Sequence, residues 1–356
     1  MPQQSPTHHA PISDLHVRVL VALPSPNEVK AQLPETDAAA AAVVSARQSI
    51  QKILLGEDPR MLIIVGPCSI HDQKAALEYA RKLNELRKQV ESTMLVVMRV
   101  YFEKPRTTTG WKGLVYDPYL NDTFEMAEGL RIARRLLLAI NEMGLPCATE
   151  FLDPFVPQYL ADLISWAAIG ARTTESQTHR QMASGLSMPV GYKNSTTGDL
   201  QVAINAMLSA RAPHAFLGID GQGRVCSVHT TGNRQGHVIL RGGEKLTNFD
   251  PQAVTDASAR LEKAKLPPGL MVDCSHANSG KKHTGQNIVW RSVIQQRVAG
   301  NRHLVGMMLE SNLSPGRQDI PADLSKLCYG VSVTDECIGW DETAQLLLDA
   351  HRQLKP

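Results

Sequence analysis

The chain has 356 residues, of which 43% are hydrophobic, so it can bury a sizeable core as one large domain or two modest ones. Its 37 Lys and Arg residues nearly balance 35 Asp and Glu residues, which argues against nucleic acid or a membrane surface as an obligatory partner. No apolar stretch has the length of a membrane span, the N-terminus lacks a signal-peptide pattern, and six scattered cysteines form no CxxC pair, so we expect a cytoplasmic protein with free thiols.

The first 50 residues differ from the rest of the chain and are predicted to form an N-terminal extension. They begin with Pro and polar residues and end in an Ala-rich helical run over residues 37–50. From residue 61 onward, short apolar runs alternate with amphipathic stretches. The first apolar run, MLIIVG, is rich in β-branched residues, as is typical of a strand buried on both faces.

Eight such runs predict eight strands, nearly all followed by a helix. Helix spacing is clear over residues 76–90, and Asp122 and Glu125 are placed as a capping pair for the next helix. The predicted strands cover residues 61–66, 95–100, 147–151, 167–171, 189–193, 237–242, 270–275 and 304–310. The later helices are predicted near residues 157–165, 176–185, 199–211, 251–265, 285–299 and 342–354.

One segment interrupts this alternation. Residues 215–219 and 224–230, joined through Asp220 and Gly221, read as a β-hairpin inserted at 213–232. Eight βα units over roughly 250–300 residues predict an α/β fold of the (β/α)8 TIM-barrel type, covering residues 51–356. The alternative is a doubly wound open sheet.

The polar residues that follow the predicted strands share one position. Each strand ends in, or runs directly into, a residue able to bind charge or metal. In chain order these are Cys68, Arg99, Glu150, Arg172, Lys193, Arg241, His276 and Glu310. Barrel enzymes build their sites at the C-terminal ends of the strands, so a site is predicted there.

Most of these residues fall into two chemical groups. The first group consists of cations. A single Arg or Lys side chain at a strand end usually just reaches solvent, but several that converge repel one another unless an anion neutralises them. The cations are Arg99, Arg172, Lys193 and Arg241. The second group is Cys68, His276 and Glu310, with Asp335 left open as a fourth member. A thiolate, an imidazole and carboxylates suit a borderline divalent ion, although the wide spacing of these residues gives no support by itself.

Seven motifs resemble one enzyme family, the metal-dependent and feedback-regulated 3-deoxy-D-arabino-heptulosonate 7-phosphate (DAHP) synthases of bacteria and fungi. The motifs are GPCSIHD (66–72), MRVYFEKPRTTTGWKG (98–113), IGARTTESQ (169–177), PVGYKN (189–194), HVILRGG (237–243), DCSHANS (273–279) and VTDECIGW (333–340). The resemblance implies a transferase that condenses phosphoenolpyruvate with erythrose 4-phosphate and water, as the first step of the shikimate pathway. Two residues beside Lys193 depart from the family pattern, Tyr192 in place of Phe and Ser195 in place of Gly.

The resemblance also implies roles for individual residues. It implies one divalent ion (Mn, Fe, Co or Zn) on Cys68, His276, Glu310 and Asp335, and phosphoenolpyruvate on Arg99, Arg172, Lys193 and Arg241. Erythrose 4-phosphate would contact Lys104, Pro105, Arg106, Thr107 and Asp335, and the catalytic groups would be Lys104, Glu150 and His276.

Finally, the resemblance implies a homo-oligomer, a dimer or tetramer, inhibited by tyrosine or phenylalanine. The inhibitor would bind away from the catalytic end of the barrel, and the N-terminal extension of a neighbouring subunit would complete its site. The matching positions are Asp14, Pro157, Gln158, Leu186, Ser187, Phe216 and Val228. Three alternatives stay open: a related synthase with another sugar acceptor, a regulatory barrel that only binds an aromatic amino acid, and an unrelated metallohydrolase.

Overall fold

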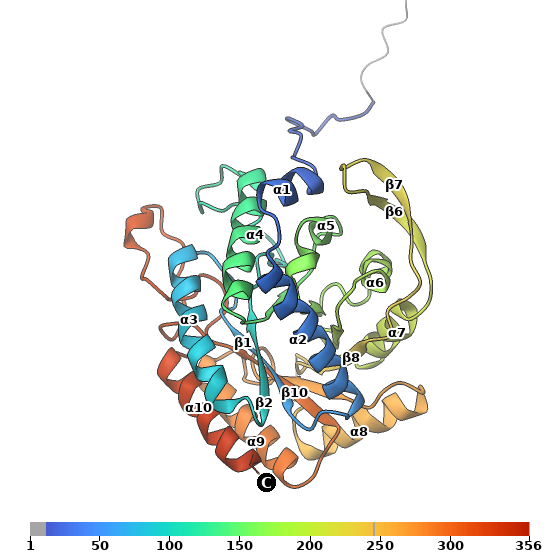
Figure 1. Ribbon diagram of the computed structural model, residues 1–356, viewed down its shortest axis with the longest axis vertical. Helices are drawn as coiled ribbons and strands as arrows, with labels where there is room; N and C mark the ends of the chain where they lie inside the picture. Colours follow the sequence, from blue (N-terminus) through green and yellow to red (C-terminus); the bar gives the residue numbers. More distant parts are fainter. Residues whose placement is uncertain (1–11, 245, 356) are drawn as a thin grey trace, which may run out of the picture.

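The computed structural model describes residues 12–244 and 246–355, and within these ranges eight parallel strands close into a barrel (Figure 1). Strand β1 pairs with β2 on one side and with β10 on the other, so the sheet has no free edge and the open-sheet alternative is wrong. The strands are β1 (Met61–Gly66), β2 (Met94–Arg99), β3 (Cys147–Glu150), β4 (Trp166–Ile169), β5 (Val190–Lys193), β8 (Gly236–Leu240), β9 (Leu270–Asp273) and β10 (Leu304–Glu310). The prediction of a (β/α)8 barrel is confirmed.

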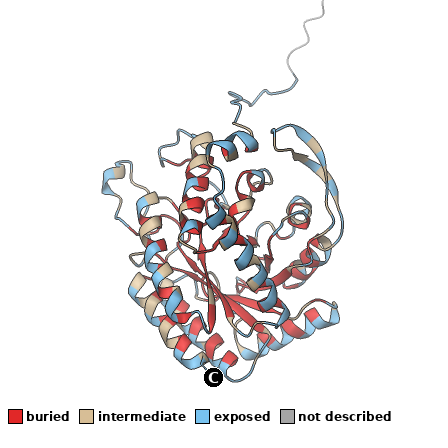
Figure 2. Ribbon diagram, in the orientation of Figure 1, coloured by how far each residue is buried: buried red, intermediate tan, exposed pale blue. Residues whose placement is uncertain are grey.

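The barrel strands are buried on both faces, apart from the half-buried Leu95 (Figure 2). In β1, Ile63 and Val65 belong to the core shared with the helices, whereas Leu62 and Ile64 belong to a second core inside the barrel. This second core includes Ile50, Ile53 and Leu54, which pack with the barrel side chains although they come from a helix that precedes β1. Alternation along the strand therefore separates two apolar layers, as the pleat requires.

The helices that follow the strands cover the outside of the barrel. They are α3 (Gln73–Val90), α4 (Met126–Glu142), α5 (Val156–Leu160), α6 (Gln177–Ser184), α7 (Gln201–Ala210), α8 (Pro251–Lys263), α9 (Gln286–Val298) and α10 (Trp340–Leu354). No helix among the described residues is both long and apolar enough to cross a membrane. The predicted helix at 157–165 is shorter than expected, because α5 ends at Leu160 and a single 3₁₀ turn over Ala161–Leu163 follows it.

The predicted capping pair of Asp122 and Glu125 is wrong. Helix α4 begins only at Met126, and Glu125 occupies the N-cap position without a side-chain hydrogen bond to the helix. Asp122 and Phe124 have φ angles of 59° and 53°, which are left-handed values that a right-handed helix cannot contain. The chain therefore turns sharply before α4.

The N-terminal extension contributes two helices, α1 (Pro26–Gln32) and α2 (Asp37–Leu55), and residues 1–11 of it lie outside the described residues. The residue-50 boundary expected from the sequence falls inside α2. The inserted hairpin consists of β6 (Ala215–Ile219) and β7 (Val225–His229), as predicted, and it curves past α6 and α7 (Figure 1). Its tip contacts α1, where the backbone N–H of Asn27 donates to the Gly221 carbonyl at 2.8 Å.

Tyr192, one of the two departures from the family pattern, places its hydroxyl in the core without a hydrogen-bond partner among the described residues. We expect Tyr192→Phe to raise the free energy of unfolding by about 1 kcal/mol, because an unpaired buried hydroxyl loses its hydration without compensation. Urea unfolding of both proteins measures the change. Tyr79→Phe is the matched control, since it removes a buried hydroxyl that bonds Ser311 Oγ at 2.9 Å and should destabilise by about 1 kcal/mol. A loss of stability in Tyr192→Phe would show that this hydroxyl has a partner.

Candidate metal and anion site

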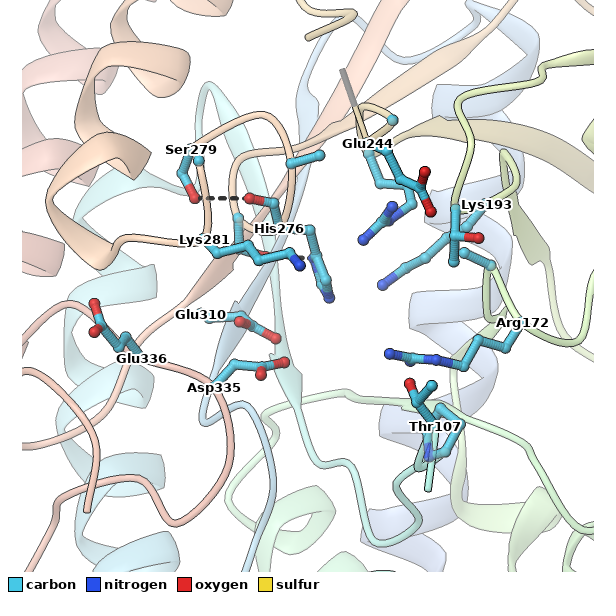
Figure 3. Close-up of a pocket in the computed structure, with 18 of the residues that line it drawn as sticks. Thr107, Arg172, Lys193, Glu244, His276, Ser279, Lys281, Glu310, Asp335 and Glu336 are labelled. Atoms are coloured by element: carbon cyan, nitrogen blue, oxygen red, sulfur yellow. Dashed lines mark hydrogen bonds between the residues drawn. The ribbon is translucent and has the colours of Figure 1, made fainter. Parts of the chain in front are cut away.

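A cavity of about 1020 Å³ lies where the barrel strands end (Figure 3). Seven of the eight strand-end residues line it, namely Arg99, Glu150, Arg172, Lys193, Arg241, His276 and Glu310. The eighth, Cys68, is fully buried, and its Sγ lies 3.1 Å from Lys104 Nζ, a group that does line the cavity. The sequence-based expectation that these side chains gather at one end of the barrel is therefore met by the geometry.

Three of the four candidate ligands form a compact group. One ligand atom each from Cys68, Glu310 and Asp335 lies within 4.8 Å of the others. Burial, followed by the charge of Glu310, raises the pKa of the Cys68 thiol to about 12. Although burial raises the pKa of Asp335, the charges of Lys104 and His276 lower it to about 2. A buried thiol between carboxylates fits a divalent cation, which would deprotonate the thiol and neutralise the acids.

His276 lies beside this group, but neither ring nitrogen is within 4.8 Å of all three ligand atoms. Its Nδ1 lies 3.0 Å from Asp273 Oδ2 and 2.8 Å from Ser275 Oγ, so Nε2 is the ring nitrogen left for a ligand. Figure 3 shows the ring on the same side of the cavity as Glu310 and Asp335. A carboxylate close to the second ring nitrogen is the usual support for a metal-binding histidine.

Asp273 is a residue that the sequence analysis missed. It is fully buried as the last residue of β9, and its Oδ2 lies 3.1 Å from Lys193 Nζ as well as 3.0 Å from His276 Nδ1. Burial opposes the charged form, but His276 and Lys193 together hold the pKa of Asp273 well below its usual range. One carboxylate thus orients a candidate anion-binding residue and a candidate ligand. Its place at the end of a strand, inside the motif DCSH, was the available signal.

Two of the cations, Arg172 and Lys193, face the candidate ligands across the cavity, and Figure 3 shows them pointing into the same space. Arg99 is buried and donates to Glu310 Oε1 at 2.8 Å, while its Nη1 has no partner among the described residues. Burial lowers the pKa of Arg241, and the charge of Arg172 lowers it further against the opposing effect of Asp273. An anion between these side chains would relieve the repulsion.

Glu150 and the KPRT segment (residues 104–107) complete the lining of the cavity. Glu150 Oε2 lies 3.9 Å from Lys193 Nζ, and a Cβ on Gly170 would lie 2.3 Å from Glu150 Oε1, so a larger residue at position 170 would displace this carboxylate. Lys104 is buried against Cys68 and also lines the cavity, as do Pro105, Arg106 and Thr107. Lys281 and Lys282, which sequence reasoning passed over, line it as well.

The expected inhibitor positions lie on other elements. Pro157 and Gln158 belong to α5, Leu186 and Ser187 follow α6, and Phe216 pairs with Val228 across the hairpin. None of these six residues lines the cavity. Asp14 is exposed in the segment that precedes α1.

Fold and site together define a (β/α)8-barrel enzyme with a candidate Cys–Glu–Asp metal centre next to a cationic pocket. Residues 35–348 match the DAHP synthetase I family, and the chain belongs to that family.

Similar proteins agree with this assignment. The chain is 52% identical over 343 residues to phospho-2-dehydro-3-deoxyheptonate aldolase, Tyr-sensitive, of Escherichia coli, with 96% of each chain covered. It is 50% identical to the Phe-sensitive enzyme of the same organism, covering 94% of this chain and 95% of the relative. The solved structure of phospho-2-dehydro-3-deoxyheptonate aldolase from Francisella tularensis SCHU S4 superposes with a TM-score of 0.92 at 45% identity, over 96% of this chain and all of that one.

Proposed function

We propose that this enzyme condenses phosphoenolpyruvate with D-erythrose 4-phosphate and water, giving DAHP and phosphate, as the first step of the shikimate pathway. The observation that carries the proposal is the Cys68–Glu310–Asp335 group facing a pocket of cations in a member of this family. A site for a dianionic or trianionic substrate next to a Lewis acid is what this condensation needs.

Phosphoenolpyruvate is the substrate that we assign to Arg99, Arg172, Lys193 and Arg241. Its phosphate and carboxylate together carry about −2.5 to −3 charge, which the four cations can balance. Arginine side chains bind each group through two parallel hydrogen bonds, and the unpaired Nη1 of Arg99 is one available donor. Fixing both ends of the molecule orients its C3 atom for attack, so part of the rate enhancement comes from positioning.

Erythrose 4-phosphate is assigned to the KPRT segment, with its phosphate on Arg106 and Thr107 and with Pro105 and Asp335 beside it. Lys104 supplies a hydrogen bond or a proton to the aldehyde oxygen as negative charge develops there. Burial lowers the pKa of Lys104, but the neighbouring Cys68 and Asp335 raise it more, so the side chain stays protonated and able to donate.

One divalent ion, for which Mn, Fe, Co and Zn are the candidates, would be held by Cys68, His276, Glu310 and Asp335 and would polarise the aldehyde as a Lewis acid. Carbon C3 of phosphoenolpyruvate forms the new bond to the aldehyde carbon. Water then adds at C2, and the resulting phosphohemiketal breaks its C–O bond to release phosphate. Glu150 and His276 are the two candidates for activating that water, since both line the cavity.

Regulation and assembly form the second part of the proposal. Relatives are named Tyr-sensitive and Phe-sensitive, which supports feedback inhibition of this chain by an aromatic amino acid. We assign the inhibitor to the α5 and hairpin positions, with residues 1–50 as a regulatory and oligomerisation extension, residues 51–356 as the catalytic barrel, and Asp14 supplied by a partner in a homodimer or homotetramer. The contact between Asn27 and Gly221 already joins this extension to the hairpin.

A phosphate-release assay tests the proposal. We expect release only when phosphoenolpyruvate and erythrose 4-phosphate are both present, loss of the signal with a chelator, and recovery on adding Mn²⁺. Adding Tyr, Phe and Trp separately then identifies the inhibitor, as a fall in initial rate. Full activity in excess chelator would contradict the metal assignment, and a preference for arabinose 5-phosphate would contradict the acceptor.

A further inference from the structure

Two loops at the open end of the barrel hold two of the candidate ligands, His276 and Asp335. The His276 loop (residues 274–285) follows β9, and the Asp335 loop (residues 311–339) follows β10, the neighbouring strand. In residues 12–244 and 246–355, one pair makes the only direct hydrogen bonds between these two loops. Glu336 Oε2 accepts from the His283 backbone amide at 3.1 Å and lies 2.7 Å from His283 Nδ1. Since an ionised carboxylate only accepts, Nδ1 carries the hydrogen.

The His276 loop has a backbone that its surroundings must hold in place. His276 and Lys281 have φ angles of 59° and 62°, left-handed values that are unfavourable for residues with a Cβ. The Lys281 amide closes the turn by donating to the His276 carbonyl at 2.7 Å. Such backbone strain persists only where neighbouring contacts fix the segment, and His283 lies two residues beyond the turn.

The Asp335 loop is tied to β1 on one side. Ser69 Oγ and Thr334 Oγ1 lie 2.7 Å apart, and the Cys68 amide contacts Cys337 Sγ at 3.4 Å. These contacts flank Asp335 and hold it near Cys68, and the Ile338 amide donates to the Glu310 carbonyl at 2.9 Å, which ties the end of the loop to β10. Gln286 and Glu310, which directly adjoin the two loops, exchange two hydrogen bonds of 2.9 Å. Among the described residues, the hydrogen bonds of Glu336 are the ones that join the two loops themselves.

The direction of the Glu336 side chain separates it from the reacting groups. Figure 3 shows Glu310 and Asp335 directed into the cavity, whereas the carboxylate of Glu336 lies to one side of them. The side chains of His283 and Glu336 are 26% and 34% exposed, so the pair lies at the cavity edge and is partly shielded from solvent. Glu336 thus lines the edge of the cavity, and its carboxylate is placed to hold His283.

We propose that the His283–Glu336 pair is a positioning latch that sets the spacing between His276 and the Cys68–Glu310–Asp335 group, and thereby the affinity for a divalent cation. The proposal rests on the proposed function, because it takes His276 and Asp335 as ligands of the same ion. Groups bonded directly to metal ligands change metal affinity by about 10- to 100-fold in other metal sites, so we expect this pair, which lies one step further from the ion, to act at the lower end of that range.

The experiment measures the dissociation constant for Mn²⁺ in the full chain without substrates, from the electron paramagnetic resonance signal of free Mn²⁺. We expect His283→Ala and Glu336→Ala each to weaken binding about 10-fold. The double variant should bind no more weakly than either single one, since both remove one contact. Glu336→Gln keeps an acceptor oxygen for His283 and should remain within about threefold of the unmodified chain.

Tyr329→Phe is the matched control. It removes a 2.8 Å hydrogen bond that ties the same Asp335 loop to Glu78 of α3, away from β9, and should leave the Mn²⁺ affinity unchanged. Equal weakening in this control, additive effects in the double variant, or alanine variants that bind as tightly as the unmodified chain would each overturn the latch. Failure of the unmodified chain to bind Mn²⁺, Co²⁺, Fe²⁺ or Zn²⁺ would instead overturn the proposed function.

Discussion

Replacing Cys68 with Ala is expected to lower the rate of phosphate release by at least about 100-fold, because loss of a direct ligand costs no less than loss of a supporting contact. The thiol lies within 4.8 Å of the Glu310 and Asp335 oxygens, and no other sulfur or nitrogen belongs to that group among the described residues. The variant should keep its far-ultraviolet circular dichroism spectrum. Metal content after dialysis, measured by atomic emission, should fall with the rate.

Cys147→Ala is the matched control for Cys68→Ala. Cys147 is an equally buried free thiol on β3, and its surroundings are apolar core residues. Because the two substitutions remove the same atom from buried positions, they should cost similar stability, yet only Cys68→Ala should lose metal. A Cys68→Ala enzyme with normal rates in metal-stripped buffer would refute the ligand assignment.

Arg172→Ala is expected to raise the KM for phosphoenolpyruvate by about 10- to 100-fold, the effect of losing a charged hydrogen bond of about 1.5–3 kcal/mol. Arg172 is exposed, forms no salt bridge with the described residues, and points into the cavity (Figure 3), so its guanidinium is available to a substrate. The KM for erythrose 4-phosphate should change much less. Initial rates at varied concentrations of each substrate separate the two effects.

Two further variants test whether the charge or the forked donors of Arg172 account for the rise in the KM for phosphoenolpyruvate. Arg172→Lys keeps the charge but not the forked donors, so it should fall between Arg172→Ala and the unmodified enzyme. Arg81→Ala removes the same charge from an exposed position on α3 that does not line the cavity, and it should leave both KM values unchanged. An Arg172→Ala enzyme with unchanged kinetics towards phosphoenolpyruvate would remove this residue from the pocket.

The fold was predictable because its strands are buried on both faces. A run such as MLIIVG has no polar face, so neither an amphipathic helix nor a half-exposed strand competes with a buried strand. The start of α4 was not predictable in this way, because the left-handed backbone of Asp122 and Phe124 leaves no mark on hydrophobic periodicity. Local patterns indicated which elements form but not where this turn occurs.

The part of the candidate site that lies at the ends of the strands was predictable. Arg99, Glu150, Lys193 and Glu310 are the last residues of their strands, so topology alone brings them to one end of the barrel. Asp335 comes from an irregular loop, and contacts such as Ser69–Thr334 bring it to Cys68. Contacts between residues so far apart in sequence follow from packing in three dimensions, so the residue pattern left Asp335 open and only the family resemblance selected it as the fourth ligand.

The position of helix α2 has a consequence for any attempt to shorten the N-terminal extension. The last turns of this helix insert Ile50, Ile53 and Leu54 into the core inside the barrel, where each contributes roughly 1.5–3 kcal/mol. Whole domains are stable by only about 5–15 kcal/mol. Removing the chain up to and including these residues would therefore take away a large part of the stability of the barrel. Deletion of the residues before Asp37 would leave α2 and its three core side chains in place.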